Sequence, residues 1–166
     1  MSLRSWFEWM DAFPSSIALR ESLYAFPVLL TIHVVSLAMF AGLVVMMDLR
    51  LVGLAYRGAR FSEVQARLFP WQMVGMVLTT LTGLLLFYMQ PMRYFGKVYY
   101  WIKLALIVLA GVNALVFHLT TYRSVAKWDT AGPPFRAKVA GVLSLAMWAC
   151  IVAFGRFAAY DWLTYE

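Results

Sequence analysis

The chain carries little charge, a single cysteine and only two histidines, and each scarcity excludes a class of protein. Charged residues make up 13% of the 166 residues, hydrophobic residues make up 63%, and the mean hydropathy is +0.74. A soluble domain typically has about 25% charged residues. A water-soluble surface cannot be built from this composition. The lone cysteine, Cys150, excludes a disulfide framework, a CxxC metal site and a c-type haem attachment motif.

Motifs of soluble enzymes are also absent. The chain has no GxSxG, Walker loop, HExxH or glycine-rich dinucleotide fingerprint. Polar residues between Trp6 and Asp11 interrupt any cleavable-signal pattern at the N-terminus. The net charge of +6 does not indicate nucleic acid, because the basic residues lie in short loops between apolar runs. Whether the chain is an enzyme stays open.

Four apolar stretches are long enough to cross about 30 Å of hydrocarbon, which takes roughly 20 helical residues. They cover approximately residues 23–47, 70–89, 98–122 and 139–162. The short connections between them predict antiparallel neighbours. We therefore expect an all-α fold, an integral membrane four-helix bundle that forms one transmembrane domain over residues 1–166.

An N-terminal interfacial amphipathic helix is predicted ahead of the first span. Leu3, Trp6, Phe7 and Met10 follow helical spacing, with charged residues between them. Pro14 is expected to end this helix, and Ser15 or Ser16 to cap the next one. Pro27 is expected to remove one backbone hydrogen bond early in the first span and to cause a mild kink.

The loop charges predict the orientation. The first and third loops hold eight basic residues: Arg50, Arg57, Arg60, Arg67, Arg123, Lys127, Arg136 and Lys138. By the positive-inside rule these loops are cytoplasmic. The chain is then a multi-pass protein of the bacterial inner membrane with both termini periplasmic. An aromatic belt is expected at the outer interface, formed by Trp6, Trp9, Tyr24, Tyr94, Tyr99, Tyr100, Trp101, Tyr160, Trp162 and Tyr165.

Small residues form stripes on three of the predicted helices. They are Gly75, Thr79, Thr82 and Gly83 on the second, Ala110, Gly111 and Ala114 on the third, and Gly141, Gly155 and Ala159 beside Trp148 on the fourth. Such stripes allow close helix packing in lipid. They could equally leave room for a flat cofactor between the helices.

Five polar residues inside the predicted spans are candidates for function, because each costs about 2.5–3.5 kcal/mol at mid-bilayer. They are His33, Lys103, Asn113, His118 and Arg156. Neutral imidazole is a ligand of haem iron or copper. At about 100° per residue, Lys103 and His118 share a helix face with the small residues of the third helix. His33 shares its face with Leu37, Phe40, Val44 and Asp48.

Simpler explanations compete with these roles. A lone membrane histidine can hydrogen-bond a neighbouring helix, and Asn113 is more often interhelical glue than a ligand. Lys103 and Arg156 can snorkel to the headgroups, and methionines such as Met73 and Met76 are usually packing. Depth is a further difficulty. His33 lies about 22 Å from the inner boundary and His118 about 7 Å, so one haem joining both is doubtful.

Three segments carry a resemblance to known proteins: "LTIHVVSLAMFAGLVVMMDLRLVGL", "YYWIKLALIVLAGVNALVFH" and "AFGRFAAY". Together they resemble an uncharacterised family of bacterial four-helix inner-membrane proteins. More distantly, the chain is similar to HemJ-type protoporphyrinogen oxidases and CopD-type copper-resistance proteins. His33, Arg50, the Trp101–Leu104 run and His118 match the HemJ-type outline. That resemblance implies a membrane protein that binds haem b.

The leading hypothesis is a b-type haem protein in electron transfer or a membrane redox reaction. His33 and His118 are the predicted iron ligands, in one site or two, and Lys103 and Arg156 are predicted to hold the haem propionates. Copper handling through His33, His118 and some methionines is the first alternative. A cofactor-free accessory subunit of a larger complex is the second. Besides lipid, the partners left open are a redox protein, a quinone, a second copy of the chain or other subunits.

Overall fold

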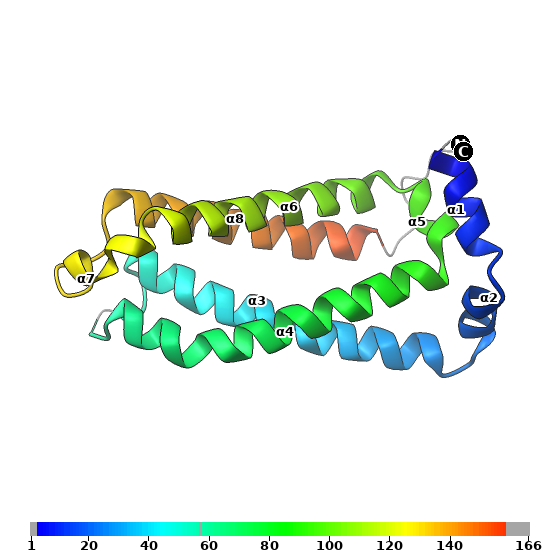
Figure 1. The fold of residues 1–166 in the computed structure, drawn as a ribbon, viewed down its shortest axis with the longest axis horizontal. Coiled ribbons are helices and arrows are strands. Elements are labelled where there is room, and N and C mark those ends of the chain that lie inside the picture. Colours follow the sequence, from blue (N-terminus) through cyan, green and yellow to red (C-terminus); the bar gives the residue numbers. More distant parts are fainter. Residues whose placement is uncertain (1–2, 57, 159–166) are drawn as a thin grey trace.

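The computed structural model describes residues 3–56 and 58–158, and its elements there are all helical (Figure 1). Four long helices form the body: α3 (Ala25–Val52), α4 (Phe61–Met89), α6 (Val98–Leu119) and α8 (Phe135–Phe157). Short helices lie at the two ends: α1 (Leu3–Asp11), α2 (Pro14–Glu21), α5 (Pro91–Phe95), the 3₁₀ turn η1 (Tyr122–Ser124) and α7 (Val125–Trp128). We call the end with α1, α2 and α5 the N-terminal end, and the end with α7 the loop end. The all-α prediction is confirmed.

The four long helices are long and apolar enough to cross a membrane. Their outward faces expose large apolar side chains, including Val28, Val35, Val77, Leu84, Val108, Leu115, Val142 and Val152. Exposed apolar surface on this scale would aggregate in water but is solvated by lipid tails. The chain is therefore a multi-pass membrane protein, as predicted from its composition.

The predicted helix bounds need correction at several ends. α4 begins at Phe61 and runs through Pro70, which had been predicted to start it. Its 29 residues span about 43 Å, more than the hydrocarbon thickness. The first turns of α4 carry polar residues, and a prediction from hydropathy therefore excludes them from the span. In the same way α8 starts at Phe135, and α3 continues to Val52, where Gly53 ends it with φ of +85°. The predicted end of the last helix, 158–162, lies almost wholly outside the described residues.

At the N-terminal end, the predicted amphipathic helix is present as α1. The expected cap by Ser15 or Ser16 is wrong, because Phe13 is the N-cap residue of α2. Pro14 occupies the first position of α2, where its missing N–H costs nothing. Ser15 and Ser16 instead hydrogen-bond the hydroxyl (2.6 Å) and the carbonyl (2.8 Å) of Tyr88 on α4. These bonds tie α2 to the bundle.

The predicted effect of Pro27 is also wrong. Because α3 begins at Ala25, Pro27 lies in its first turn, where the N–H groups have no intrahelical partner. No backbone hydrogen bond of the helix is lost there.

An aromatic cluster closes the N-terminal end. The Phe7 ring contacts those of Phe87, Phe95 and Trp101, at centroid distances of 5.5, 4.9 and 6.2 Å. Tyr100 stacks on Phe87 at 5.7 Å. Several members of the predicted aromatic belt thus gather at one end of the bundle. Tyr160, Trp162 and Tyr165 lie outside the described residues.

The long helices associate as two antiparallel pairs. α3 pairs with α4 and α6 with α8, and α3 also contacts α8, while α4 and α6 are not in close contact (Figure 1). Glycines make the close approaches possible. A Cβ on Gly75 would lie 3.0 Å from Phe40 Cβ, and one on Gly141 would lie 3.2 Å from the Asp48 carbonyl oxygen. The predicted stripes of small residues on α4 and α8 therefore serve helix packing, which is one of the two roles predicted for them.

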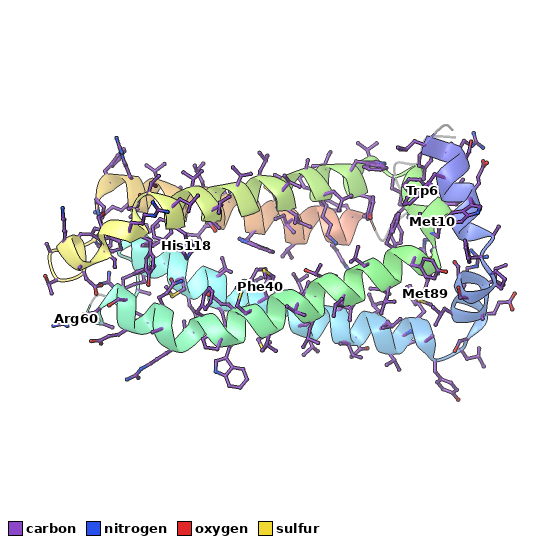
Figure 2. The ribbon with its side chains drawn as sticks, in the orientation of Figure 1. Trp6, Met10, Phe40, Arg60, Met89 and His118 are labelled. Atoms are coloured by element: carbon purple, nitrogen blue, oxygen red, sulfur yellow. The ribbon has the colours of Figure 1, made fainter. Side chains whose placement is uncertain are left out.

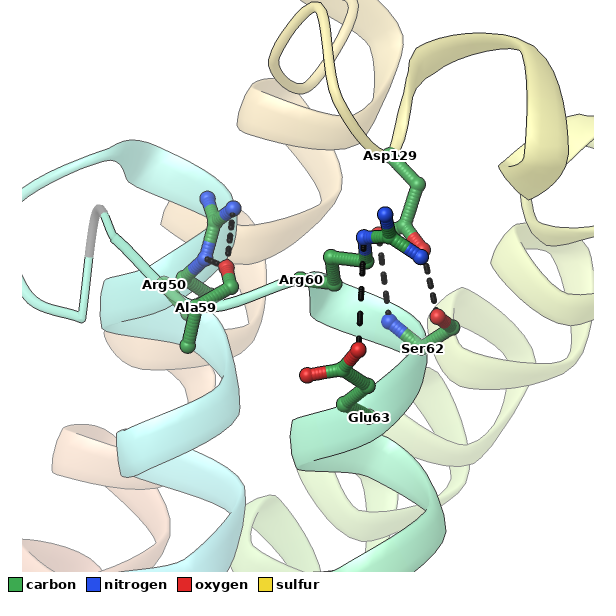
Figure 3. A network of polar contacts seen from close by, with 6 residues as sticks. All are labelled: Arg50, Ala59, Arg60, Ser62, Glu63 and Asp129. Atoms are coloured by element: carbon green, nitrogen blue, oxygen red, sulfur yellow. Dashed lines mark hydrogen bonds and ion pairs between the residues drawn. The ribbon is translucent and has the colours of Figure 1, made fainter.

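The loop end is held by polar contacts between the loop segments (Figure 3). The Asp129 carboxylate accepts hydrogen bonds from the backbone N–H of Ser62 (3.2 Å) and from its hydroxyl, and so caps the first turn of α4. Burial tends to raise the pKa of the Asp129 carboxyl. The hydrogen bonds from Ser62 and Phe61 and the charge of Arg60 outweigh burial and hold that pKa below its ordinary value. Arg50 donates two hydrogen bonds to the Ala59 carbonyl, at 2.9 and 2.7 Å.

Candidate cofactor site

A cavity of about 520 Å³ runs along the interior of the bundle between all four long helices. Most of its wall is apolar. Its polar lining residues are His33 and Asp48 from α3, Gln65, Gln72, Thr79 and Thr80 from α4, Tyr100, Lys103, Asn113 and His118 from α6, and Ser144 from α8. Both histidines and Lys103 thus face one cavity. The small residues of α6 that were predicted to share a face with Lys103 and His118 line the same cavity: Ala110, Gly111 and Ala114.

His33 lies in the half of the cavity toward the N-terminal end. Its Nδ1 is 3.0 Å from the Thr82 hydroxyl oxygen on α4. Thr82 gives its one hydroxyl hydrogen to the Leu78 carbonyl at 2.6 Å, so it accepts the hydrogen bond from His33 Nδ1–H. The imidazole then carries its lone pair on Nε2, which accepts no hydrogen bond from a described residue. The Thr79 backbone carbonyl is a further acceptor beside the ring. A Cβ on Gly83 would lie only 3.1 Å from His33 Cε1, so this glycine makes room for the ring.

Lys103 lies in the same half of the cavity. Its Cδ, Cε and Nζ atoms pass 3.7 Å from the position of a Cβ on Gly155 of α8. Within residues 3–56 and 58–158 it makes no ion pair or side-chain hydrogen bond. Arg156 follows Gly155 in the chain, so the two cations lie at similar depth. Arg156, however, is exposed and is not among the residues that line the cavity.

His118 lies in the opposite half, near the loop end (Figure 2). Its Nδ1–H donates to the Ala114 carbonyl at 2.8 Å, one helical turn earlier. Its Nε2 therefore accepts the hydrogen bond from the Gln65 amide, at 3.2 Å. The Phe117 and Tyr122 rings flank the imidazole at 5.4 and 5.3 Å.

The two histidines cannot bind one iron in this arrangement. Their partners on α4, Thr82 and Gln65, are seventeen residues apart, which is about 25 Å along a helix. Two axial ligands of a haem bind opposite faces of one ring and must lie at one depth. In the described part of the chain, no three His, Cys, Asp or Glu side chains come together as metal ligands either. The histidines thus belong to separate places in the cavity.

An apolar belt separates these two places. Phe40 and Trp148 meet edge to face at 5.1 Å across the middle of the cavity, and Met73 and Met76 line its α4 side. Figure 2 shows Phe40 near the middle of the bundle. Asn113 donates a hydrogen bond to the Ala140 carbonyl of α8 at 3.0 Å, which is the interhelical role expected for it.

Three polar residues of the cavity were missed as candidates by sequence reasoning. Asp48, Gln65 and Gln72 are only 6%, 8% and 8% exposed, and polar side chains inside a membrane protein are costly and often functional. Gln65 fell outside the predicted second span. Asp48 had been placed on the helix face of His33 and at the inner boundary of the first span, but had not been considered as a ligand-binding residue. The spacing of Gln65 and Gln72, seven residues apart and hence on one helix face, was a usable signal.

Comparisons with protein-family models, with curated proteins and with solved structures find no significant match to this chain. The resemblance to HemJ-type and CopD-type proteins therefore stays a prediction. Function has to be argued from the chemistry of the cavity itself.

Proposed function

We propose that this chain is a b-type haem protein of the bacterial inner membrane that takes part in electron transfer or a membrane redox reaction. The observation that carries the proposal is the state of His33. Its ring is fixed on one side by Thr82 and Gly83, and its Nε2 faces no hydrogen-bond donor in the described structure. A haem iron would bind this nitrogen in the N-terminal half of the cavity.

The Thr82 hydrogen bond supports a ligand role for His33. Metal-bound histidines usually donate their other ring N–H to an acceptor, which fixes the tautomer and the orientation of the ring. Thr82 is itself fixed by its bond to the Leu78 carbonyl. The imidazole is thereby oriented before any ligand arrives.

Lys103 supports an anionic ligand at the same place. A lysine ammonium within the membrane is costly unless an opposite charge lies nearby, and no carboxylate of the described chain pairs with it. The propionates of a haem held by His33 would supply that charge. A bound haem provides reversible one-electron chemistry of its iron, and a neighbouring cation favours the reduced state.

The size and lining of the cavity are also suitable. Organic ligands and cofactors occupy pockets of about 300–1,000 Å³ with mostly apolar walls and a few polar groups. Aromatic rings of Phe40, Phe87, Tyr100 and Trp148 line this one. His118 could ligate a second iron near the loop end only if Gln65 gave up its hydrogen bond. We therefore assign the haem to His33 first.

Purification and absorption spectroscopy test the proposal. The parent protein should carry haem with a Soret band, His33→Ala should lose it, and His118→Ala should retain it. Thr82→Val, which removes the hydroxyl that accepts the hydrogen bond from Nδ1, should bind haem about 10–100-fold more weakly than the parent. Loss of haem in His118→Ala alone would move the site to the loop end. A parent protein with copper and no Soret band would replace haem by copper handling, and a metal-free protein would favour an accessory role.

Redox titration tests the role of Lys103. Lys103→Met should lower the midpoint potential of the haem and weaken its retention, because a cation that stabilises the reduced form is gone. Arg156→Met is the matched comparison at the same depth. Since Arg156 lies outside the cavity wall, we expect a smaller shift there. Equal shifts in both variants would mean that the propionates reach both cations.

A further inference from the structure

Two polar side chains of the cavity, Asp48 and Gln72, keep hydrogen-bonding groups that no described residue uses, and neither side chain belongs to the His33 site. Ser144 of α8 hydrogen-bonds the Asp48 side chain. Asp48 is 6% exposed, and its Oδ2 is buried without a hydrogen-bond partner. Gln72 is 8% exposed and makes no side-chain hydrogen bond to any residue the structure describes. Buried polar groups are nearly always satisfied, so an exception calls for an explanation. A ligand with polar groups at both positions would provide one.

The spacing of the two residues limits the size of such a ligand. Gly75 lies against Phe40, so Gln72, three residues earlier on the antiparallel helix, lies level with Leu43. Asp48 is five residues further along α3, which is about 7.5 Å. One six-membered ring with oxygens at opposite ends, together with a hydrogen bond of about 2.7–3.0 Å at each end, is long enough to cover this separation along the helix axis.

The cavity is accessible from lipid. Phe69, Met76, Leu84 and Ile107 line it and are 38–60% exposed. They come from α4 and α6, the neighbouring helices that are not in close contact. Side chains alone therefore close this wall, and a membrane-soluble molecule can enter between them. Inside, a Cβ on Gly111 would meet nothing within 4 Å, so the wall leaves room near the level of Gln72.

We propose that the half of the cavity toward the loop end binds the dihydroxy-aromatic headgroup of a membrane quinol. One hydroxyl donates to the Asp48 carboxylate, and the other exchanges a hydrogen bond with the Gln72 amide. A lipid tail has no donor for Asp48, and a quinone has only acceptors. An Asp48 side chain that accepts a hydrogen bond at Oδ2 therefore favours the reduced, hydroxylated form. We choose a quinol over other hydroxylated amphiphiles because a quinol carries electrons, and this choice rests on the proposed haem function. Binding of the headgroup itself does not need haem.

Titration with decylubiquinol and with decylubiquinone, under anaerobic conditions and in nanodiscs, tests this site. The parent protein should bind the quinol more tightly than the quinone. Asp48→Asn keeps the shape of the side chain but exchanges an acceptor for a donor. It should weaken quinol binding by about tenfold or more and strengthen quinone binding. Glu63→Gln, the same chemical change on an exposed side chain, should alter neither affinity. Unchanged quinol affinity in Asp48→Asn, or no binding by the parent, would overturn the proposal.

A second variant covers the case that Asp48→Asn does not fold. A Cβ at position 111 meets nothing within 4 Å, so Gly111→Leu extends a side chain into the cavity from α6 and should abolish quinol binding. Unaltered binding in Gly111→Leu would place the ligand elsewhere and overturn the proposal. The same titration with haem-free His33→Ala separates the two proposals. Quinol binding by His33→Ala would show that this site does not need haem. Quinol binding by a parent protein that never carries haem would sustain this site and refute the haem proposal. A haem-loaded parent that binds no quinol would refute this site alone.

Discussion

Gly83→Ala is the sharpest test of how His33 is held. The added Cβ would lie 3.1 Å from His33 Cε1 and 3.6 Å from Nδ1, closer than the roughly 3.5–4.0 Å at which carbon atoms normally touch. The imidazole must then retreat from α4 by a few tenths of an ångström. Because Nδ1 already lies 3.0 Å from the Thr82 oxygen, this movement stretches the hydrogen bond that orients the ring.

The effects on stability nearly cancel. Replacing a mid-helix glycine by alanine gains about 0.5–1 kcal/mol, and a weakened interhelical hydrogen bond costs about 0.6 kcal/mol. The free energy of unfolding should therefore change by less than about 1 kcal/mol. Binding sites are less tolerant, since loss of the group that orients a metal-bound histidine typically costs about 10–100-fold in affinity. We expect haem affinity to fall by about tenfold.

Gly155→Ala is the matched control. Its Cβ would meet the Lys103 side chain at 3.7 Å, an ordinary contact, so the variant should be slightly stabilised and should keep its haem. The assay is haem transfer to an acceptor protein, followed by the Soret band, alongside denaturant unfolding of both variants. Equal haem retention in the two variants would show that the Gly83 contact does not orient an iron ligand.

Three further predictions follow from the fold. Reporter fusions should place Lys127 in the cytoplasm and Gly96 on the opposite side, and a periplasmic signal at Lys127 would reverse the orientation. The Asp129 carboxylate, whose pKa is lowered by its bonds to Ser62, stabilises the fold above pH 4 and loses this effect as the pH falls through its folded-state pKa. Asp129→Asn should therefore flatten the loss of stability seen on acid titration below about pH 4. Gly75→Ala should destabilise by about 1–2 kcal/mol in denaturant unfolding, because its Cβ would meet the neighbouring helix backbone at 3.1 Å; a stabilised variant would contradict that packing.

Much of this architecture could be predicted from the sequence because the membrane imposes it. Lipid leaves every spanning backbone group to be satisfied within its own helix, so four apolar runs of about 20 residues give four helices. The helix bounds were less predictable. Hydropathy places the boundary of the hydrocarbon, whereas α4 continues through Pro70 into the polar residues beyond it.

The faces of single helices were also predictable. At 100° per residue, His33 shares a face with Phe40 and Asp48, and Lys103 shares one with His118. The structure places all five on the wall of one cavity. The distance between the two histidines along the membrane could be judged in the same way, because rise per residue is fixed. This distance indicates that the two histidines lie in different parts of the cavity. Their separate partners, Thr82 for His33 and Gln65 for His118, agree with it.

Tertiary structure alone decided what each polar group meets. Periodicity gives the direction of a side chain but not its neighbour on another helix, which depends on the packing and stagger of the pairs. The Thr82 bond that leaves His33 Nε2 available is set by the close α3–α4 contact. The absence of a partner for Asp48 Oδ2 and the wide approach of α4 to α6 are likewise outcomes of packing. Small residues on a helix permit both close contact and open space, and only the assembled bundle shows that Gly75 makes contact whereas Gly111 faces open space.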